Sequence, residues 1–308
     1  MEMRKIFGNY LEKAMAKNRK ICVLDADLAK ADGTISLRSK YPKRAFDCGI
    51  AEANMASVAA GLSAYGFIPF ITTFTPFATR RICDQIAVSI AYGGANVKIV
   101  GTDPGIAAEL NGGTHMSFED IAVLRSIPNM VIFEPVDNAQ LLQALPQIVK
   151  HNGPVYIRMF RKETPDVFTD PNYKFKLFRA DKLRDGKDLS IFASGLCVKD
   201  CLTACEILQE KGVSVDLINV HTLKPLDTET IVKSASTTKA VLTVENHNVI
   251  GGLYSAVAET LAQRCPVKAA AVGIHDEFGE VGKIPALKER YGMTVDDIVR
   301  KALEVVGR

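Results

Sequence analysis

Short apolar runs alternate with amphipathic stretches along most of the chain. The apolar runs are rich in Val and Ile with little polar alternation, which is typical of strands covered on both faces. They lie at residues 21–25, 97–101, 130–133, 155–159, 189–193, 213–218, 240–244 and 269–273. Stretches suited to helices lie at 3–17, 53–65, 77–91, 137–149, 197–211, 227–236 and 252–263. This alternation predicts an α/β protein with mostly parallel sheets flanked by helices.

The alternation is interrupted between about Lys162 and Lys187. That stretch is rich in charges, contains prolines and has no helical period, so it favours a connection with some short structure of its own. We therefore expect two consecutive α/β domains, residues 1–165 and 188–308, joined by a linker at 166–187.

Composition and charge exclude several classes of binding partner and location. The 308 residues include 38 Lys and Arg against 35 Asp and Glu, a net charge of +3 that gives no footprint for nucleic acid or a membrane surface. No apolar run is long enough to span a bilayer, and the first residues lack the apolar core of a secretory signal. The seven cysteines are odd in number and sparse, so we expect a reducing, cytoplasmic setting without disulfides.

The usual motifs for phosphate and metal binding are missing. There is no GxxxxGK[ST], no GxGxxG after the first strand and no HExxH. Cys197, Cys201 and Cys205 share one helix face, but nothing nearby completes a metal set, so buried small side chains are the simpler interpretation. The pair Gly251–Gly252 precedes a helix, where it either exposes backbone N–H groups to an anion or allows close packing.

Glu52 is the first candidate for chemistry. It stands where a loop enters a helix whose following residues are unusually small, within FDCGIAEANMASVAAGLSAYG at 46–66. A carboxylate at a helix start ordinarily caps the helix. The alternative is a partly buried carboxylate that faces a ligand across a tight helix–helix contact and shares a proton with it.

Three further segments carry candidate residues. Phe70, Phe74 and Phe77 lie close together in a chain with 7% aromatic residues, and they suit either a core or a wall on which a flat heterocycle stacks. His115 ends a glycine-rich loop, where it is either a surface side chain or a group for proton transfer and substrate binding. Arg158 and Arg161 stand at a strand end, either solvated or clamping a carboxylate or phosphate.

Taken together, five segments resemble transketolase in the family's order. They are FDCGIAEANM, TFTPF, NGGTHMSFEDIAVLRSIPNM, GPVYIRMFR and VENHNVIGGLYSAVAE. The resemblance covers nearly the whole chain and implies a pyrimidine-binding domain followed by a transketolase C-terminal domain. Deoxyxylulose-phosphate synthase and the beta subunits of 2-oxo acid dehydrogenases share this architecture, but the stretch from THM to LRSIPNM favours the transketolase side.

The resemblance also implies a partner. Transketolases carry a further N-terminal domain in which a GDG motif and a following Asn hold the divalent metal and the diphosphate of thiamine diphosphate, and no GDG occurs here. We expect the C-terminal subunit of a split transketolase. A separate N-terminal subunit would hold the diphosphate with Mg or Ca, and this chain no metal. Two copies of each subunit are expected, because the small-residue helix after Glu52 should pack at an interface.

Roles follow from the matched positions. Glu52 matches the glutamate that hydrogen-bonds the aminopyrimidine nitrogen and favours its imino tautomer. Phe77 matches the aromatic that stacks on the pyrimidine, with Phe74 in the same pocket. His115 matches the histidine that contacts sugar hydroxyls near the reacting carbon. Arg161 matches the arginine that binds the sugar phosphate, with Arg158 as a helper.

Two positions depart from the family pattern. Asn111 replaces an aspartate that reads a substrate hydroxyl; it forms hydrogen bonds but carries no charge. Asp103 stands where a phosphate-contacting histidine is expected, and a carboxylate repels a phosphate. His221, at a strand end, is expected to be structural.

The expected activity is transfer of a two-carbon ketol unit from a ketose phosphate to an aldose phosphate. The alternatives are a deoxyxylulose-phosphate synthase-like or 2-oxo acid dehydrogenase beta-type subunit, and a non-catalytic scaffold or regulatory subunit.

Overall fold

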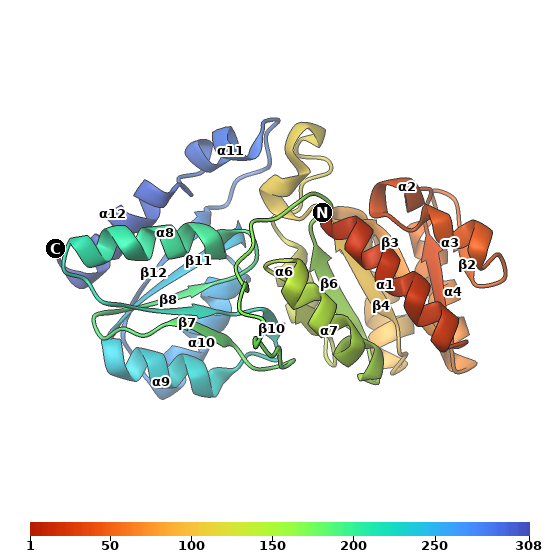
Figure 1. Cartoon of the computed structure of the whole chain (residues 1–308), viewed down its shortest axis with the longest axis horizontal. Coiled ribbons are helices and arrows are strands. Elements are labelled where there is room, and N and C mark those ends of the chain that lie inside the picture. The colour runs from red at the N-terminus through yellow and green to blue at the C-terminus, as the bar shows by residue number, and fades with distance from the viewer.

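A computed structural model describes residues 1–308 and consists of two α/β domains lying side by side (Figure 1). The first contains a seven-stranded sheet in the order β10-β5-β6-β4-β3-β1-β2, and the second a five-stranded sheet in the order β12-β11-β8-β9-β7. The strands are parallel except β10 and β7, which lie antiparallel at sheet edges. The predicted fold class is confirmed.

The first sheet is built from short strands. They are β1 (Ile21–Asp25), β2 (Ala45–Asp47), β3 (Ile68–Phe74), β4 (Lys98–Thr102), β5 (Val131–Phe133), β6 (Val155–Met159) and β10 (Thr222–Lys224). The helices around it are α1 (Met3–Lys17), α2 (Ala29–Asp32), α3 (Ile35–Lys40), α4 (Glu52–Ala64), α5 (Thr75–Ala78), α6 (Asp120–Arg125) and α7 (Asn138–Lys150). Two 3-10 segments, η1 (Arg80–Ile82) and η3 (Gly105–Asn111), and the π-helix η2 (Gln85–Tyr92) complete the domain.

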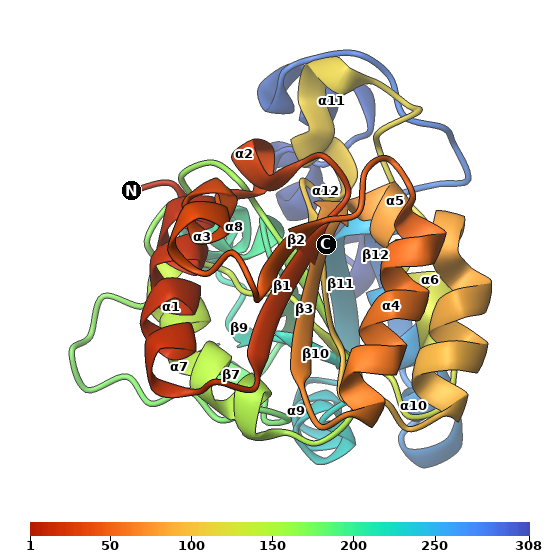
Figure 2. The same ribbon diagram turned by 90° about the vertical axis from the view of Figure 1, so that its right-hand side faces the viewer.

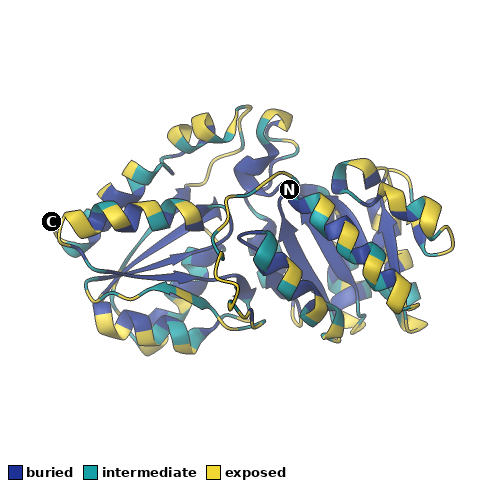
Figure 3. Ribbon diagram, viewed as in Figure 1, coloured by how far each residue is buried: buried dark blue, intermediate teal, exposed yellow.

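Helices cover both faces of this sheet, as Figure 2 shows for α1 and α7 on one side and α4 on the other. Neighbouring residues of one strand therefore enter different cores. Val23 belongs to the same apolar cluster as Phe7 of α1, whereas Leu24 belongs to the cluster that contains Met55 of α4. This two-sided burial explains why the strands read as continuous apolar runs, and Figure 3 shows them buried beneath half-exposed helices.

The second domain repeats the arrangement. Its strands are β7 (Asp181–Arg184), β8 (Leu189–Ala193), β9 (Val215–Asn219), β11 (Ala240–Asn248) and β12 (Lys268–Ile274). Its helices are α8 (Cys197–Glu210), α9 (Thr228–Thr238), α10 (Leu253–Arg264), α11 (Ile284–Arg290) and α12 (Val295–Val306). Strand β7 lies inside the stretch expected to be the linker and pairs with β9. The three cysteines of α8 are buried free thiols in the core.

The two domains share a strand. After β9 the chain crosses to the first sheet, where β10 pairs with β5. Beside this crossing His221 is fully buried, with its ring 4.6 Å from that of Phe175. Burial lowers the pKa of His221 to about 4, so the imidazole is neutral. None of the helices combines the length and the apolar character needed to cross a bilayer.

Candidate active site

The carboxylate of Glu52 is buried at the start of α4. The residue is 4% exposed, and Ala51 occupies the N-cap position. Its Oε1 atom accepts a hydrogen bond from Nη1 of Arg81 at 2.7 Å. The side chain therefore pairs with a cation from η1 rather than capping its own helix.

Arg81 ties Glu52 to an aromatic wall. Its guanidinium carbon lies 3.8 Å from the ring centroid of Phe77 in α5. The Phe77 ring is 6.2 Å from that of Phe74, the last residue of β3. Both rings are half-buried, whereas Phe70 is fully buried against Phe7. The aromatic segment thus divides, with one ring in the core and two half-buried rings side by side, and the stacking of a heterocycle on those two stays a prediction.

His115 completes this group. Its imidazole lies edge-on to the wall, 5.2 Å from the Phe77 centroid and 6.0 Å from that of Phe74. One ring nitrogen, Nδ1, lies 2.9 Å from Oγ1 of Thr114. The Nε2 atom has no hydrogen-bond partner within the chain and is free for a ligand.

The loop that carries His115 is held by the second domain. A Cβ added to Gly113 would collide with the carbonyl oxygen of Gly279, so only glycine allows this approach. A pocket of about 330 Å³ opens beside the loop, lined by Arg80, Met116, Phe118, Glu119, Asn248 and residues 276–279. Asn111, at the end of η3, is exposed, so its amide is open to solvent rather than packed against the aromatic wall.

Arg161 and Arg158 have different environments despite their proximity in sequence. Arg161 follows β6, and its guanidinium carbon lies 4.7 Å from the ring centroid of Phe74. Its Nε atom donates to Oδ2 of Asp103 at 2.5 Å. Arg158 lies within β6 and is 0% exposed. The structure therefore corrects the expectation that Arg158 helps to bind substrate, because its side chain does not reach the surface.

Arg158 instead forms a buried ion network. It donates to Asp120 at 2.7 Å and to Glu134 at 2.5 Å, and Tyr156 donates to the same Asp120 at 2.8 Å. Burial opposes ionisation of Asp120, but the charge of Arg158 outweighs it and lowers the pKa of Asp120. A further bond to the carbonyl oxygen of Asn246 at 2.8 Å links the network to β11 of the second domain.

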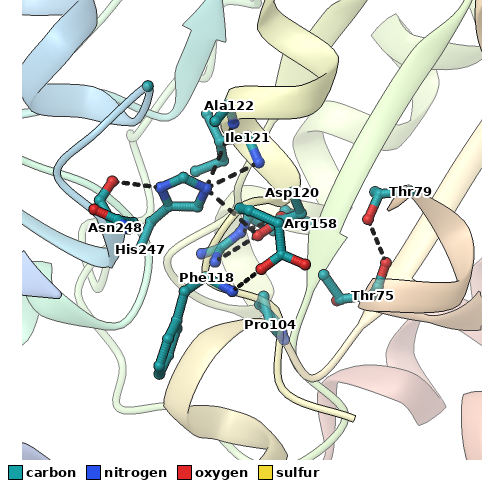
Figure 4. Close-up of polar contacts among 12 residues, drawn as sticks. Thr75, Thr79, Pro104, Phe118, Asp120, Ile121, Ala122, Arg158, His247 and Asn248 are labelled. Atoms are coloured by element: carbon teal, nitrogen blue, oxygen red, sulfur yellow. Dashed lines mark hydrogen bonds and ion pairs between the residues drawn. The ribbon is translucent and has the colours of Figure 1, made fainter. Parts of the chain in front are cut away.

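His247 joins the domains beside this network, as Figure 4 shows. Its Nε2 accepts from the backbone N–H of Ile121 at 3.1 Å, and Nδ1 lies 2.6 Å from the carbonyl oxygen of Asn248. These partners require a neutral ring protonated at Nδ1. Burial lowers the pKa of His247 to about 4, in agreement.

The glycine pair before α10 is already occupied by an internal carboxylate. Glu245 accepts from the backbone N–H groups of Leu253 and Tyr254 at 2.6 and 2.8 Å. A Cβ on Gly252 would collide with that carboxylate. The N–H groups after the pair thus bind a carboxyl group of the chain itself, and the missing Cβ of Gly252 allows its close approach.

The comparisons with known proteins agree with this architecture. Residues 1–166 match the family described as "Transketolase, pyrimidine binding domain", and residues 179–298 match "Transketolase, C-terminal domain". The chain belongs to the transketolase family. The resemblance inferred from its motifs is thereby confirmed, and transketolases depend on thiamine diphosphate.

Individual relatives of this transketolase-family chain match over nearly their full length. It is 50% identical over 306 residues to the 6-deoxy-6-sulfo-D-fructose transketolase subunit SqwH of Clostridium sp. (strain MSTE9), covering 99% of this chain and 95% of that protein. A subunit of the apulose-4-phosphate transketolase of Phocaeicola vulgatus is 35% identical, with 98% and 97% covered. A solved structure described as "Split gene transketolase, inactive beta4 tetramer" superposes with a TM-score of 0.91 at 41% identity, covering 100% of this chain and 99% of that one.

Arg81 was not among the residues expected from the sequence, although a signal was present. In the helix expected at 77–91, an arginine four positions after Phe77 would lie on the same face as that ring, where a guanidinium can stack. The structure interrupts this helix at Thr79 but still brings the two side chains together.

Proposed function

We propose that this chain is the pyrimidine-binding subunit of a split transketolase. Paired with a separate diphosphate-binding subunit, it would transfer a two-carbon ketol unit from a ketose to an aldose. The observation that carries the proposal is the grouping of a buried carboxylate, two neighbouring aromatic side chains and a histidine with a free ring nitrogen, contributed by Glu52, Phe74, Phe77 and His115.

The residues present fit one end of thiamine diphosphate. A flat pyrimidine suits the wall of Phe74 and Phe77, and its ring nitrogen suits the carboxylate of Glu52. The other end needs a divalent metal for the diphosphate, and no group of three or more His, Cys, Asp or Glu side chains in this chain is arranged to hold one. Mg²⁺ or Ca²⁺ would therefore be held by the partner subunit. When bound, the cofactor supplies an electron sink for the carbanion that forms as the sugar is cleaved.

Each side chain would have a defined task. Glu52 would share a proton with the pyrimidine nitrogen through Oε2, because Arg81 already occupies Oε1. Its burial keeps competing water away from that proton. His115 would hydrogen-bond a sugar hydroxyl through its free Nε2. Arg161, whose guanidinium lies over the ring of Phe74, would bind the anionic terminus of the sugar.

The names of two relatives support a substrate class. One is named for a sulfonated fructose and the other for a sugar phosphate, so both names describe sugars with an anionic group. We infer that this chain also acts on ketoses and aldoses with an anionic terminus. Asn111, at the end of η3, would select among sugar hydroxyls without adding charge.

The partner would cover an exposed surface on α4 and η2. Small side chains of α4 are exposed beside Val58, which is 40% exposed, and η2 exposes Val88 and Tyr92 at 58% and 90%. A surface of this kind suits close helix packing between subunits. We propose two copies of each subunit, and the tetramer formed by the related split-gene transketolase chain supports self-association of such chains.

Reconstitution tests the proposal. This chain would be co-expressed with a transketolase N-terminal subunit that carries the GDG motif and its following Asn. The mixture, with thiamine diphosphate and Mg²⁺, should transfer ketol units from a ketose phosphate or sulfonate, and neither chain alone should do so. Release of carbon dioxide from pyruvate without ketol transfer would contradict the proposal and favour a 2-oxo acid enzyme.

A further inference from the structure

The arginine expected to bind the sugar's anionic terminus already has a fixed anionic partner. Besides the bond from Nε at 2.5 Å, a second nitrogen of Arg161, Nη2, forms an ion pair with Oδ2 of Asp103. Oδ1 of Asp103 accepts the backbone N–H of Arg161 at 3.0 Å. Asp103 is only 4% exposed, so water screens this pair weakly.

The backbone holds Asp103 in this position. Its N–H donates to the carbonyl oxygen of Met159 at 2.9 Å, at the end of β6. Its φ of 52° lies in the left-handed region, which a non-glycine residue adopts only when its surroundings fix it. The carboxylate is thus a built part of the site rather than a surface group that can swing away.

No cation other than Arg161 pairs with Asp103. Lys162, the next residue along the chain after Arg161, forms its own ion pair with Glu109 of η3. Asp32 of α2 is buried behind the pair, accepts from Thr102 at 2.8 Å and adds further negative charge whenever it is ionised. Nη1 of Arg161 takes no part in the pair with Asp103, so one edge of the guanidinium is left to donate to a ligand while its charge is already balanced.

We infer that Asp103 makes the Arg161 subsite selective for a sugar terminus with one negative charge, such as a sulfonate, over a phosphate dianion. The inference rests on the proposed function and specifies its substrate class. A second negative charge on the terminus gains nothing from the balanced arginine and is repelled by the carboxylate behind it. A neutral hydroxyl would forgo the charge-assisted hydrogen bond from Nη1. The monoanion keeps that bond with the least repulsion.

The test uses the assembled two-subunit enzyme loaded with thiamine diphosphate and three ketoses that differ in their terminus. These are 6-deoxy-6-sulfofructose, fructose 6-phosphate and fructose. The wild-type ratio of kcat/KM for sulfonate over phosphate should exceed about tenfold. In Asp103→Asn, which keeps an acceptor for the Arg161 N–H, and in Asp103→His, this ratio should fall by on the order of 10- to 100-fold, mainly through KM for the phosphate.

Glu259→Gln is the control for the loss of an acid from an acid–arginine pair at the surface. Glu259 forms an acid–arginine pair of similar length with Arg125, at 2.6 Å, on the surface of α10. The ratio of kcat/KM for sulfonate over phosphate in Glu259→Gln should equal that of the wild type. Thermal melting of each variant verifies that the fold is retained.

A pH series separates charge from shape. A phosphate ester loses its second charge below a pKa of about 6, whereas a sulfonate keeps its single charge. Lowering the pH from about 7.5 to 5.5 should therefore raise the use of fructose 6-phosphate relative to the sulfonate in the wild type, and much less in Asp103→Asn. Asp32, whose pKa burial raises to about 7, loses its negative charge in the same range and also favours the phosphate, so only the part of the change that Asp103→Asn removes is assigned to Asp103. Glu109, Lys162 and Arg161 also face this region.

Three outcomes would overturn the inference. They are a wild-type preference for the phosphate, a ratio that Asp103→Asn leaves unchanged, and equal use of fructose and the sulfonate. Calorimetric binding of the same three sugars to the assembled complex measures the same selectivity without turnover. If the complex binds the sulfonate selectively but transfers no ketol unit, the proposed activity fails while the inference about Asp103 stands.

Discussion

Arg81 donates one hydrogen bond to Glu52, 2.7 Å from Nη1 to Oε1, and thereby connects the start of α4 to η1 across 29 positions of sequence. The pair is asymmetric, since the carboxylate side chain is 5% exposed and the arginine side chain 44%. The arginine can therefore be solvated without its partner, but the acid cannot.

Replacing Glu52 by Gln should abolish ketol transfer while leaving the fold intact. The amide keeps an oxygen for Arg81 but cannot share a proton with a ring nitrogen as a carboxyl can, so turnover should fall by at least about 100-fold. Steady-state assays of the reconstituted enzyme measure this, with Glu259→Gln as the control. Unchanged turnover would favour a scaffold role for the chain.

A double-mutant cycle on the free energy of unfolding should show that Arg81 and Glu52 are energetically coupled. Arg81→Met leaves the buried carboxylate without its donor, and the free energy of unfolding should fall by about 1 kcal/mol, a modest loss because the arginine is half-exposed. In Arg81→Met with Glu52→Gln, part of that loss should disappear. Urea unfolding of the four proteins gives the coupling; additive losses would show that the two side chains act independently.

Substitution of Arg158 should mainly lower stability, whereas substitution of Arg161 should mainly weaken substrate binding. Arg158→Met leaves Asp120 and Glu134 buried without their counterion, which should cost about 3–5 kcal/mol of unfolding free energy or prevent folding. Arg161→Met leaves only Asp103 without its counterion, so it should cost less than Arg158→Met, about 1–3 kcal/mol, but should raise KM for an anionic sugar at least about tenfold. Denaturant unfolding and kinetics on both variants check the contrast. A fully stable Arg158→Met would contradict it.

Because His247 is buried in its neutral form, the free energy of unfolding should fall as the pH is lowered. Its folded pKa of about 4 is below the ordinary value of 6.5, so between these values the unfolded chain binds one more proton than the folded chain. This contribution is complete above pH 6.5 and is lost as the pH falls toward 4, at up to about 1.4 kcal/mol per pH unit. Other buried groups titrate too, so the measured quantity is the difference in unfolding free energy between wild type and His247→Gln across about pH 4–7. Nitrogen NMR should show the Nδ1-protonated ring at about pH 6; a protonated imidazolium there would refute the assignment.

Sequence patterns predicted best the strands that are buried on both faces and the long amphipathic helix at the start of the chain. The range 3–17 coincides with α1, and the runs at 21–25, 155–159 and 189–193 coincide with β1, β6 and β8. They missed several elements, including β2, β7, α11 and α12. Strand β3 was missed because Pro69 and two threonines interrupt its apolar character, and β10 because its three residues form a strand only by pairing with β5. Such short strands depend on tertiary contacts rather than local preference.

The proximity of three candidate residues was predicted from the motifs, while their chemical roles stay predictions. Glu52, Phe77 and His115 come together as the motifs suggested. The sequence did not distinguish Arg158 from Arg161, because they are only three positions apart. Their environments differ because β6 ends at Met159, between them. Arg158 projects from the strand on the same face as Tyr156, toward Asp120, whereas Arg161 lies past the strand.

Because of strand β10, the two halves of the protein should stay associated even if the chain between them is cut. The C-terminal half contributes this strand to the N-terminal sheet, and side chains of both halves, such as Ile132 and Leu223, pack in one apolar cluster. A protease that nicked the exposed stretch around Pro171 would leave two fragments interlocked by a sheet edge and a shared interior. They would co-migrate under native conditions and part only in denaturant.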